Sequence, residues 1–168
     1  IFISIFFGTT MATLMKLAQI DLNVYTSSFF RFFLGLLIIS PYILKTNFTV
    51  YKTKNIKIHI IRSFLNLPAM LLGFASLMLV PLEKISALNF IVPFIVTILA
   101  VIFLKEKIRL FRISALVIGF IGMLIIIRPG IIDISVGIQM SLLSSLLWAI
   151  TIIITKKLSK DDSAITIL

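Results

Sequence analysis

The stretch Pro81–Arg112, PLEKISALNFIVPFIVTILAVIFLKEKIRLFR, joins a long uncharged segment to a strongly basic end. Glu83 and Lys84 precede the uncharged segment Ile85–Leu104, and several basic residues follow it. As an α-helix this segment would reach roughly 30 Å, about the thickness of the hydrocarbon core of a bilayer. Because Lys and Arg stay preferentially on the cytoplasmic face, the stretch predicts a transmembrane helix that runs from outside to inside.

Pro93 lies near the middle of this predicted helix. Proline has no backbone N–H, and its ring clashes with the preceding turn. We therefore expect a bend at Pro93 and a carbonyl at Asn89 without its normal donor. Neighbouring helices would have to satisfy that carbonyl, since no water reaches it in the bilayer.

The composition extends this interpretation to the whole chain. Apolar residues make up 60% and charged residues 13%, against roughly 25% charge in soluble domains. The net charge of +10 sits in short loops between apolar runs, so we interpret it as a topology signal and exclude nucleic acid as a partner. No cysteine is present, and His59 stands alone, so neither a metal site nor a cofactor is expected. The predicted fold is an all-α integral membrane protein.

Six transmembrane helices are expected in total. Besides Ile85–Leu104, the apolar segments are Ile1–Met15, Val24–Leu44, Ser63–Leu82, Ile113–Ile127 and Ile134–Thr155. Arg128, Pro129 and Gly130 are expected to stop the fifth helix. The first helix opens without an initiator Met, so a fragment of a longer protein is expected.

The loops alternate in charge along the chain. With the amino terminus inside, the outer loops hold only Lys16, Lys84 and Arg128, each near an acidic residue. Most basic residues fall inside, at Lys45, Lys52, Lys54, Lys57, Arg62, Lys105, Lys107, Arg109, Arg112, Lys156, Lys157 and Lys160. The positive-inside rule therefore predicts a cytoplasmic amino terminus.

The first and sixth predicted helices are weakly similar at an offset of 141 residues. Lys16 then meets Lys157, Asp21 meets Asp162, and other matches include Thr10 with Thr151. A repeat of five helices is odd in number, so its second copy would enter the membrane from the opposite side. Inverted repeats are common in secondary transporters, with the substrate site near the midplane.

Three parts of the sequence resemble the EamA domain of the drug/metabolite transporter superfamily. They are Arg31 early in the second helix, the stretch from His59 to Ile108 with its proline followed by LKEKI, and ALVIGFIGMLIIIRPG from Ala115 to Gly130. The resemblance implies a five-helix unit at residues 1–130, and the first helix of a second, inverted unit within 134–168. Members usually carry ten helices, so the chain departs from the pattern by ending after the sixth. The resemblance also implies a multi-pass protein of a bacterial inner membrane.

Arg31 is the most suggestive charge, because an Arg inside a span costs about 2.5–3.5 kcal/mol on insertion scales and usually faces a cavity or partner. It lies roughly 10 Å from the start of its helix, so its side chain would also reach the interface by snorkelling. An anion-facing role and a purely anchoring role both remain open. All six acidic residues lie in loops or at helix ends, so no intramembrane carboxylate is available for a proton relay.

Further polar residues are candidates for a substrate path: Asn66, Ser86, Asn89, Thr10 and Trp148. Each has an alternative role in helix packing, where an interhelical hydrogen bond contributes about 0.6 kcal/mol, or, for the tryptophan, in an aromatic belt. Gly119 and Gly122 are expected to permit close helix packing, as small residues do in lipid. Pro93 is expected to mark the kink.

The predicted function is a secondary transporter that moves a small polar metabolite, such as an amino acid or a nucleotide-like solute, by alternating access. An integral membrane enzyme is disfavoured, because clustered His, Asp or Glu at a membrane face is missing from the sequence. A non-transporting scaffold or assembly subunit is the remaining alternative. The expected partners are a small-molecule metabolite and the lipid bilayer; the oligomeric state is open, with a homodimer as one option.

Overall fold

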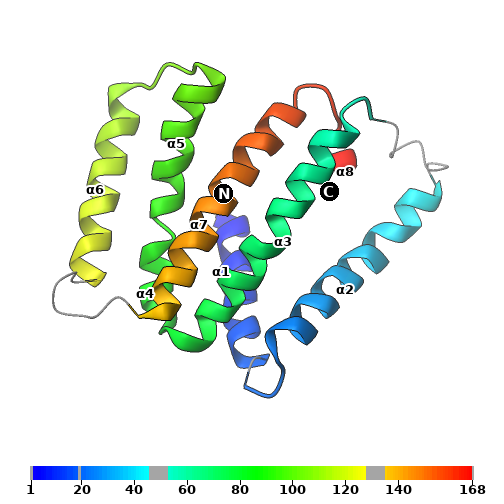
Figure 1. The fold of residues 1–168 in the computed structure, drawn as a ribbon, viewed down its shortest axis with the longest axis horizontal. Helices are drawn as coiled ribbons and strands as arrows, with labels where there is room; N and C mark the ends of the chain where they lie inside the picture. The colour runs from blue at the N-terminus through cyan, green and yellow to red at the C-terminus, as the bar shows by residue number, and fades with distance from the viewer. Residues whose placement is uncertain (1, 19, 46–52, 128–134, 168) are drawn as a thin grey trace.

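The computed structural model describes residues 2–18, 20–45, 53–127 and 135–167, and these form helices and short connections only (Figure 1). The helices are α1 (Phe2–Ala18), α2 (Val24–Lys45), α3 (Ile56–Leu79), α4 (Leu82–Leu88), α5 (Ile91–Leu104), α6 (Leu110–Ile127), α7 (Val136–Leu158) and α8 (Ala164–Ile167). The all-α prediction is therefore confirmed for the described residues.

Five segments within the described residues are long and apolar enough to cross a membrane. They are α2, α3, the α4–α5 pair counted as Leu82–Leu104, α6 and α7, with mean hydropathies from 1.5 to 2.7. Helix α1 has 17 residues. Large apolar side chains on α2 and α6 point outward, among them Phe29 and Phe111, as expected where lipid rather than water surrounds the bundle. The chain is an integral membrane helical protein.

Helices α3 and α7 form the central contact of the bundle (Figure 1). Two glycines allow the close approach. A Cβ built on Gly73 would lie 2.9 Å from the Ser144 hydroxyl, and one built on Gly137 would lie 2.7 Å from Leu79 Cβ. Small residues let helix backbones approach in lipid, where packing rather than the hydrophobic effect holds helices together. The apolar core beside this contact comprises Met70, Phe74, Leu77, Val80, Ile85, Leu88 and Ile138.

The observed helix ends differ from the predicted ones mainly next to charged residues, where the helices extend further than the apolar segments do. Helix α3 begins at Ile56 rather than Ser63, so His59 and Arg62 lie inside it. Helix α6 begins at Leu110 rather than Ile113, and α7 continues to Leu158 rather than Thr155. Long basic side chains extend along a helix toward the interface, so their charge does not end the helix. Arg128, Pro129, Gly130 and Ile134 lie outside the described residues.

The predicted helix Ile85–Leu104 is divided into α4 and α5. The break falls at Asn89 and Phe90, just before Pro93, since proline disrupts the turn that precedes it. Phe90 N–H donates to Ala87 O at 3.1 Å, and Val92 N–H donates to Asn89 O at 3.1 Å, so the turn is tightened to i, i+3 bonds. The Asn89 carbonyl, expected to lack a donor, is thus satisfied by its own chain.

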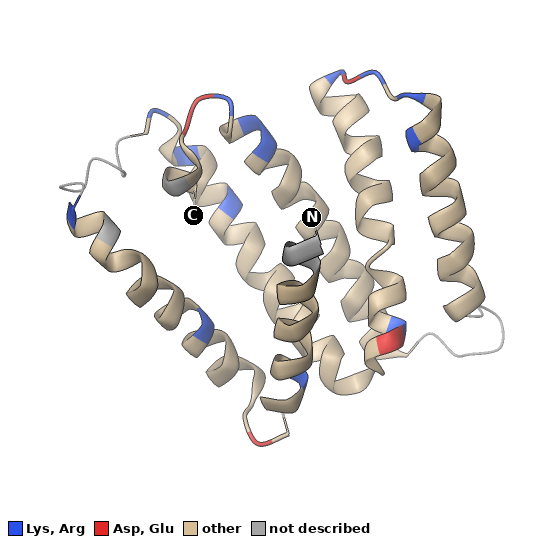
Figure 2. Ribbon diagram, turned by 180° about the vertical axis from the view of Figure 1, so that it is seen from behind, with Lys and Arg blue, Asp and Glu red and all other residues tan. Residues whose placement is uncertain are grey.

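Charged residues gather at one end of the bundle (Figure 2). This end contains the carboxyl ends of α2, α5 and α7 and the start of α3 (Figure 1). The opposite end, at the α1–α2 and α3–α4 connections, has few charges (Figure 2). The asymmetry agrees with the loop pattern seen in the sequence, and the compartment that each end faces stays a prediction.

The α1–α2 and α7–α8 connections share one hydrogen-bond pattern. Asn23 Oδ1 accepts from the N–H of Thr26 at 2.9 Å, and Ser163 Oγ accepts from the N–H of Thr166 at 3.2 Å. The preceding turns match as well, since Leu22 N–H bonds Ala18 O at 3.0 Å and Asp162 N–H bonds Leu158 O at 2.9 Å. These equivalences give an offset of 140, one less than the sequence matches.

Candidate functional site

A cavity of about 530 Å³ lies among α1, α2, α3, α4, α5 and α7. Its volume is within the range of small-molecule sites. Most of its wall is apolar, with contributions from Gly8, Met11 and Met15 of α1 and from Met70, Phe74 and Leu77 of α3. The polar residues of the wall are Arg31, Ser76, Ser86, Asn89, Ser141, Ser144 and Ser145, and Trp148 adds an indole ring.

Arg31 contributes the cation of this cavity. Its Cζ lies 5.5 Å from the centre of the Phe74 ring, a cation–π distance that joins α2 to α3. The two ion pairs found among the described residues do not involve it. Arg31 is exposed on the open side of the cavity, so its guanidinium keeps donors for another group. The contact with Phe74 places the side chain toward the bundle interior.

The break between α4 and α5 brings two predicted path residues to the cavity. Ser86 lies on α4 and Asn89 lies at the break, and both line the wall together with Val92 and Pro93. Both are exposed, and neither side chain has a hydrogen-bond partner among the described residues. An interrupted helix at a membrane cavity is the arrangement in which non-helical backbone is tolerated inside a bilayer.

Helix α7 supplies the polar residues that sequence reasoning missed. Ser141, Ser144, Ser145 and Trp148 repeat at intervals of three and four residues, so they share one face of the helix. That spacing was visible in the sequence, although only Trp148 was singled out. Ser144 Oγ donates to Ala69 O of α3 at 2.6 Å and so ties the two central helices together.

Two predicted path residues lie elsewhere. Thr10 Oγ1 donates to Phe6 O of its own helix at 2.9 Å, and Thr10 is not part of the cavity wall. Asn66 also lies outside the wall; its Oδ1 is buried without a hydrogen-bond partner among the described residues, as is Arg62 Nε one turn earlier on α3. Arg62 donates to Ile167 O of α8 through Nη2. The two glycines predicted for packing have little contact in this structure: Gly122 has no neighbour within 4 Å of a built Cβ, and Gly119 has Phe90 at 3.6 Å.

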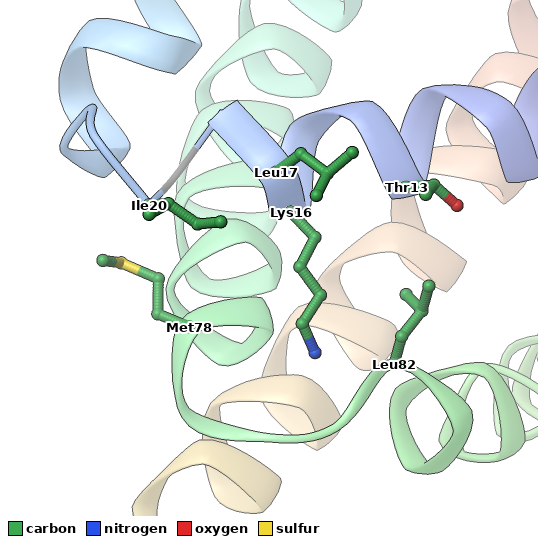
Figure 3. A pocket seen from close by; sticks show the side chains of 6 residues that line it. All are labelled: Thr13, Lys16, Leu17, Ile20, Met78 and Leu82. Carbon is green, nitrogen blue, oxygen red and sulfur yellow. The ribbon is translucent and has the colours of Figure 1, made fainter.

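A second, smaller pocket of about 410 Å³ lies at the end of the bundle with few charges (Figure 3). Thr13, Lys16, Leu17, Ile20, Met78 and Leu82 line it. Lys16 Nζ donates to Val80 O at 3.3 Å, where the chain passes from α3 to α4. Its ammonium group therefore satisfies a carbonyl beyond the end of α3.

Two ion pairs hold the basic end of the bundle. Lys156 Nζ lies 2.6 Å from Glu106 Oε1, which joins the α5–α6 connection to α7. This hydrogen bond lowers the pKa of the Glu106 carboxyl. His59 Nε2 lies 3.0 Å from Asp162 Oδ2, which also accepts from Thr53 Oγ1 at 2.9 Å. The bonds from His59 and Thr53 lower the pKa of the Asp162 carboxyl. Groups of three or more metal-ligating side chains are absent from the described residues.

A bundle of apolar helices around an internal, partly polar cavity is characteristic of membrane proteins that bind or conduct small solutes. Comparison with known proteins identifies the class further. The model of the EamA-like transporter family matches residues 1–128, and the chain belongs to this family.

Named relatives of the chain are bacterial transporters. It is 30% identical over 147 residues to the S-adenosylmethionine uptake transporter of Rickettsia felis, which covers 88% of this chain and 50% of the relative. It is 28% identical over 140 residues to the riboflavin transporter of Brucella anthropi, which covers 83% of this chain and 49% of the relative. The chain therefore spans about half the length of the curated relatives it matches. No solved structure matches it significantly.

Proposed function

We propose that this chain forms part of a secondary transporter that carries a small polar metabolite across the bacterial inner membrane by alternating access. The observation that carries the proposal is the cavity, in which Arg31, Ser86 and Asn89 face open volume among membrane-spanning helices. In a scaffold subunit these polar groups would bond neighbouring helices, because an unsatisfied polar group in hydrocarbon costs several kcal/mol. Their lack of hydrogen-bond partners among the described residues favours a solute site.

A nucleotide-like solute is the substrate class that we favour over a simple amino acid. The relatives are named for S-adenosylmethionine and riboflavin, and in both compounds a nitrogen heterocycle is joined to a hydroxylated sugar or sugar-alcohol group. In this cavity, Trp148 offers an aromatic face and Arg31 offers a cation for an anionic or zwitterionic group. The lack of an acidic residue in the cavity wall agrees with a solute that carries an anionic or zwitterionic group.

We further propose a division into a five-helix unit at residues 1–130 and the start of a second, inverted unit at 134–168. Helices α1 and α7 run in opposite directions through the bundle (Figures 1 and 2). The hydrogen bonds at the ends of α1 and α7 match one another, so α8 occupies the place of the first turn of α2. The basic end of the bundle supports a cytoplasmic amino terminus.

Uptake into membrane vesicles tests the proposal. The complete reading frame that encodes this sequence would be expressed, and uptake of labelled nucleosides, flavins and amino acids would be followed with Arg31→Ala and Asn89→Ala beside the wild type. We expect saturable uptake of a heterocyclic solute, lost in either variant at unchanged membrane abundance. Ser114→Ala is the matched control, because Ser114 is exposed on α6 and bonds Phe111 O of its own helix. Abundant, folded protein that moves no solute would refute transport.

A further inference from the structure

The hydroxyl groups of α7 divide into those that are bonded and those that are not. Ser144 donates to Ala69 O at 2.6 Å, and Thr151 donates to Leu147 O at 3.0 Å. Ser141 and Ser145 have no hydrogen-bond partner among the described residues, although they are only 2% and 3% exposed. Their Oγ atoms are not among the fully buried side-chain atoms that lack a partner, so both hydroxyls are open to the cavity that they line and can bond a molecule there.

Ser141 and Ser145 are placed to share one partner. They are four residues apart on the same face of α7, about one helical turn, and both line the central cavity. Each hydroxyl donates one hydrogen bond and accepts others, which suits a solute hydroxyl that also does both. Two neutral hydroxyls one turn apart match a polyhydroxyl chain, because each can both donate to and accept from a solute hydroxyl, whereas a carboxylate would use only their donors.

Trp148 lies three residues beyond Ser145 and lines the same cavity. Trp148 is 41% exposed, so part of the residue remains accessible. Aromatic rings stack favourably on other planar rings. The order along α7 is thus a hydroxyl-binding pair followed by a stacking surface.

We propose that Ser141 and Ser145 form a subsite that binds the hydroxyl groups of a sugar-like chain, while Trp148 stacks on the heterocycle to which that chain is attached. This inference rests on the proposed transport function and specifies which part of α7 selects the solute. In this proposal, Ser141 and Ser145 of α7 make the protein prefer a hydroxylated solute over the same solute without its hydroxyl groups.

Two matched solute pairs test the subsite: adenosine with 2′,3′-dideoxyadenosine, and riboflavin with lumiflavin, which lacks the hydroxylated chain. Binding of each pair to the protein expressed from the complete reading frame would be measured in detergent. We expect the hydroxylated member of at least one pair to bind about tenfold more tightly, the effect of one or two hydrogen bonds. Ser141→Ala and Ser145→Ala should weaken binding of that member and leave its partner unchanged. Trp148→Ala should weaken both members.

Ser114→Ala serves as the control and should keep the wild-type ratio. If the alanine variants do not fold, Ser145→Cys keeps the side-chain shape and replaces the hydroxyl with a thiol, a much weaker hydrogen-bonding group. Equal affinity of wild type for both members of each pair would overturn the subsite, as would a ratio that survives loss of Ser141 and Ser145. Failure of both pairs to bind while amino acids are still taken up would overturn the subsite alone. Failure of every solute to be taken up would overturn the transport function as well.

Discussion

Gly137→Ala is expected to destabilise the protein through the α3–α7 contact. The new Cβ would lie 2.6 Å from Val80 Cγ2 and 2.7 Å from Leu79 Cβ. The Val80 methyl group can rotate away, but Leu79 Cβ moves only with its backbone, so the two helices must separate. Overpacking of this kind costs about 1–3 kcal/mol. The helix-propensity gain of alanine over glycine, at most about 1 kcal/mol, is small for Gly137 because it is the second residue of α7.

The expected net loss is about 1–2 kcal/mol, or a fall in Tm of about 2–8 °C for a chain of this size. Thermal unfolding of purified protein in detergent, followed by tryptophan fluorescence of Trp148, measures it. Gly122→Ala is the matched control, because no atom lies within 4 Å of its Cβ, and its Tm should be unchanged or higher. A Gly137→Ala protein as stable as wild type, or a Gly122→Ala protein that loses more, would refute this account of the contact.

Three further predictions follow from the packing and the charges. Phe74→Ala removes a side chain that is 8% exposed, together with its contact to Arg31, and should lower the unfolding free energy by about 3–5 kcal/mol. Phe74→Leu should lower it much less. Thermal unfolding compares the two variants, and equal losses would contradict a role of Phe74 in core packing. The Glu106 pKa is lowered in the folded state, so the stability from its bond with Lys156 is present at neutral pH and is lost as the pH falls below the ordinary range for a glutamate. The hydrogen-exchange protection of residues 105–109, taken relative to the intrinsic exchange rate at each pH, should fall there, and Glu106→Gln should show the lower protection already at pH 7. A reporter fused after residue 130 should report the outside and one fused after Lys160 the cytoplasm; the reverse pattern would invert the proposed topology.

The course of the helices through the membrane was predictable, because apolar length dominates in lipid. Helix α2 was predicted within one residue of its observed end at Lys45. The start of α3 was not, since the positive charge of Lys57 was interpreted as loop and Arg62 as the beginning of the helix. In the structure these residues occupy the first two turns of the helix, and Arg62 bonds α8. Charge alone does not tell where a helix starts when the side chain is long.

The candidate site was predictable only in part. Arg31, Ser86, Asn89 and Trp148 line one cavity as a set, although they come from three separate parts of the chain. Asn66 and Thr10 were indistinguishable from them in the sequence, because helical periodicity does not say which face meets which neighbour. Ser141 and Ser145 were overlooked since a serine in a span is usually bonded to its own backbone, and only the structure shows that these two are not.

The offset between α1 and α7 shows how a sequence repeat can be ambiguous by one residue. The second copy has the doublets Lys156–Lys157 and Asp161–Asp162 where the first has Lys16 and Asp21, so offsets of 140 and 141 both match. Backbone hydrogen bonds have no such degeneracy. They select the offset of 140, because Asn23 and Ser163 each accept from the N–H three residues later and are 140 residues apart.

These two matching connections lie at opposite ends of the bundle (Figure 1). One is next to the few charges of the α3–α4 connection, and the other is among the basic residues around Lys156. The same turn therefore forms at a strongly basic end of the bundle and at an end with few charges. The hydrogen bonds within each connection, rather than the charges around it, set its conformation. The turn is therefore a local unit whose conformation forms on either side of the membrane, while neighbouring residues such as Asp162, which bonds His59 and Thr53, make the contacts that are particular to one end.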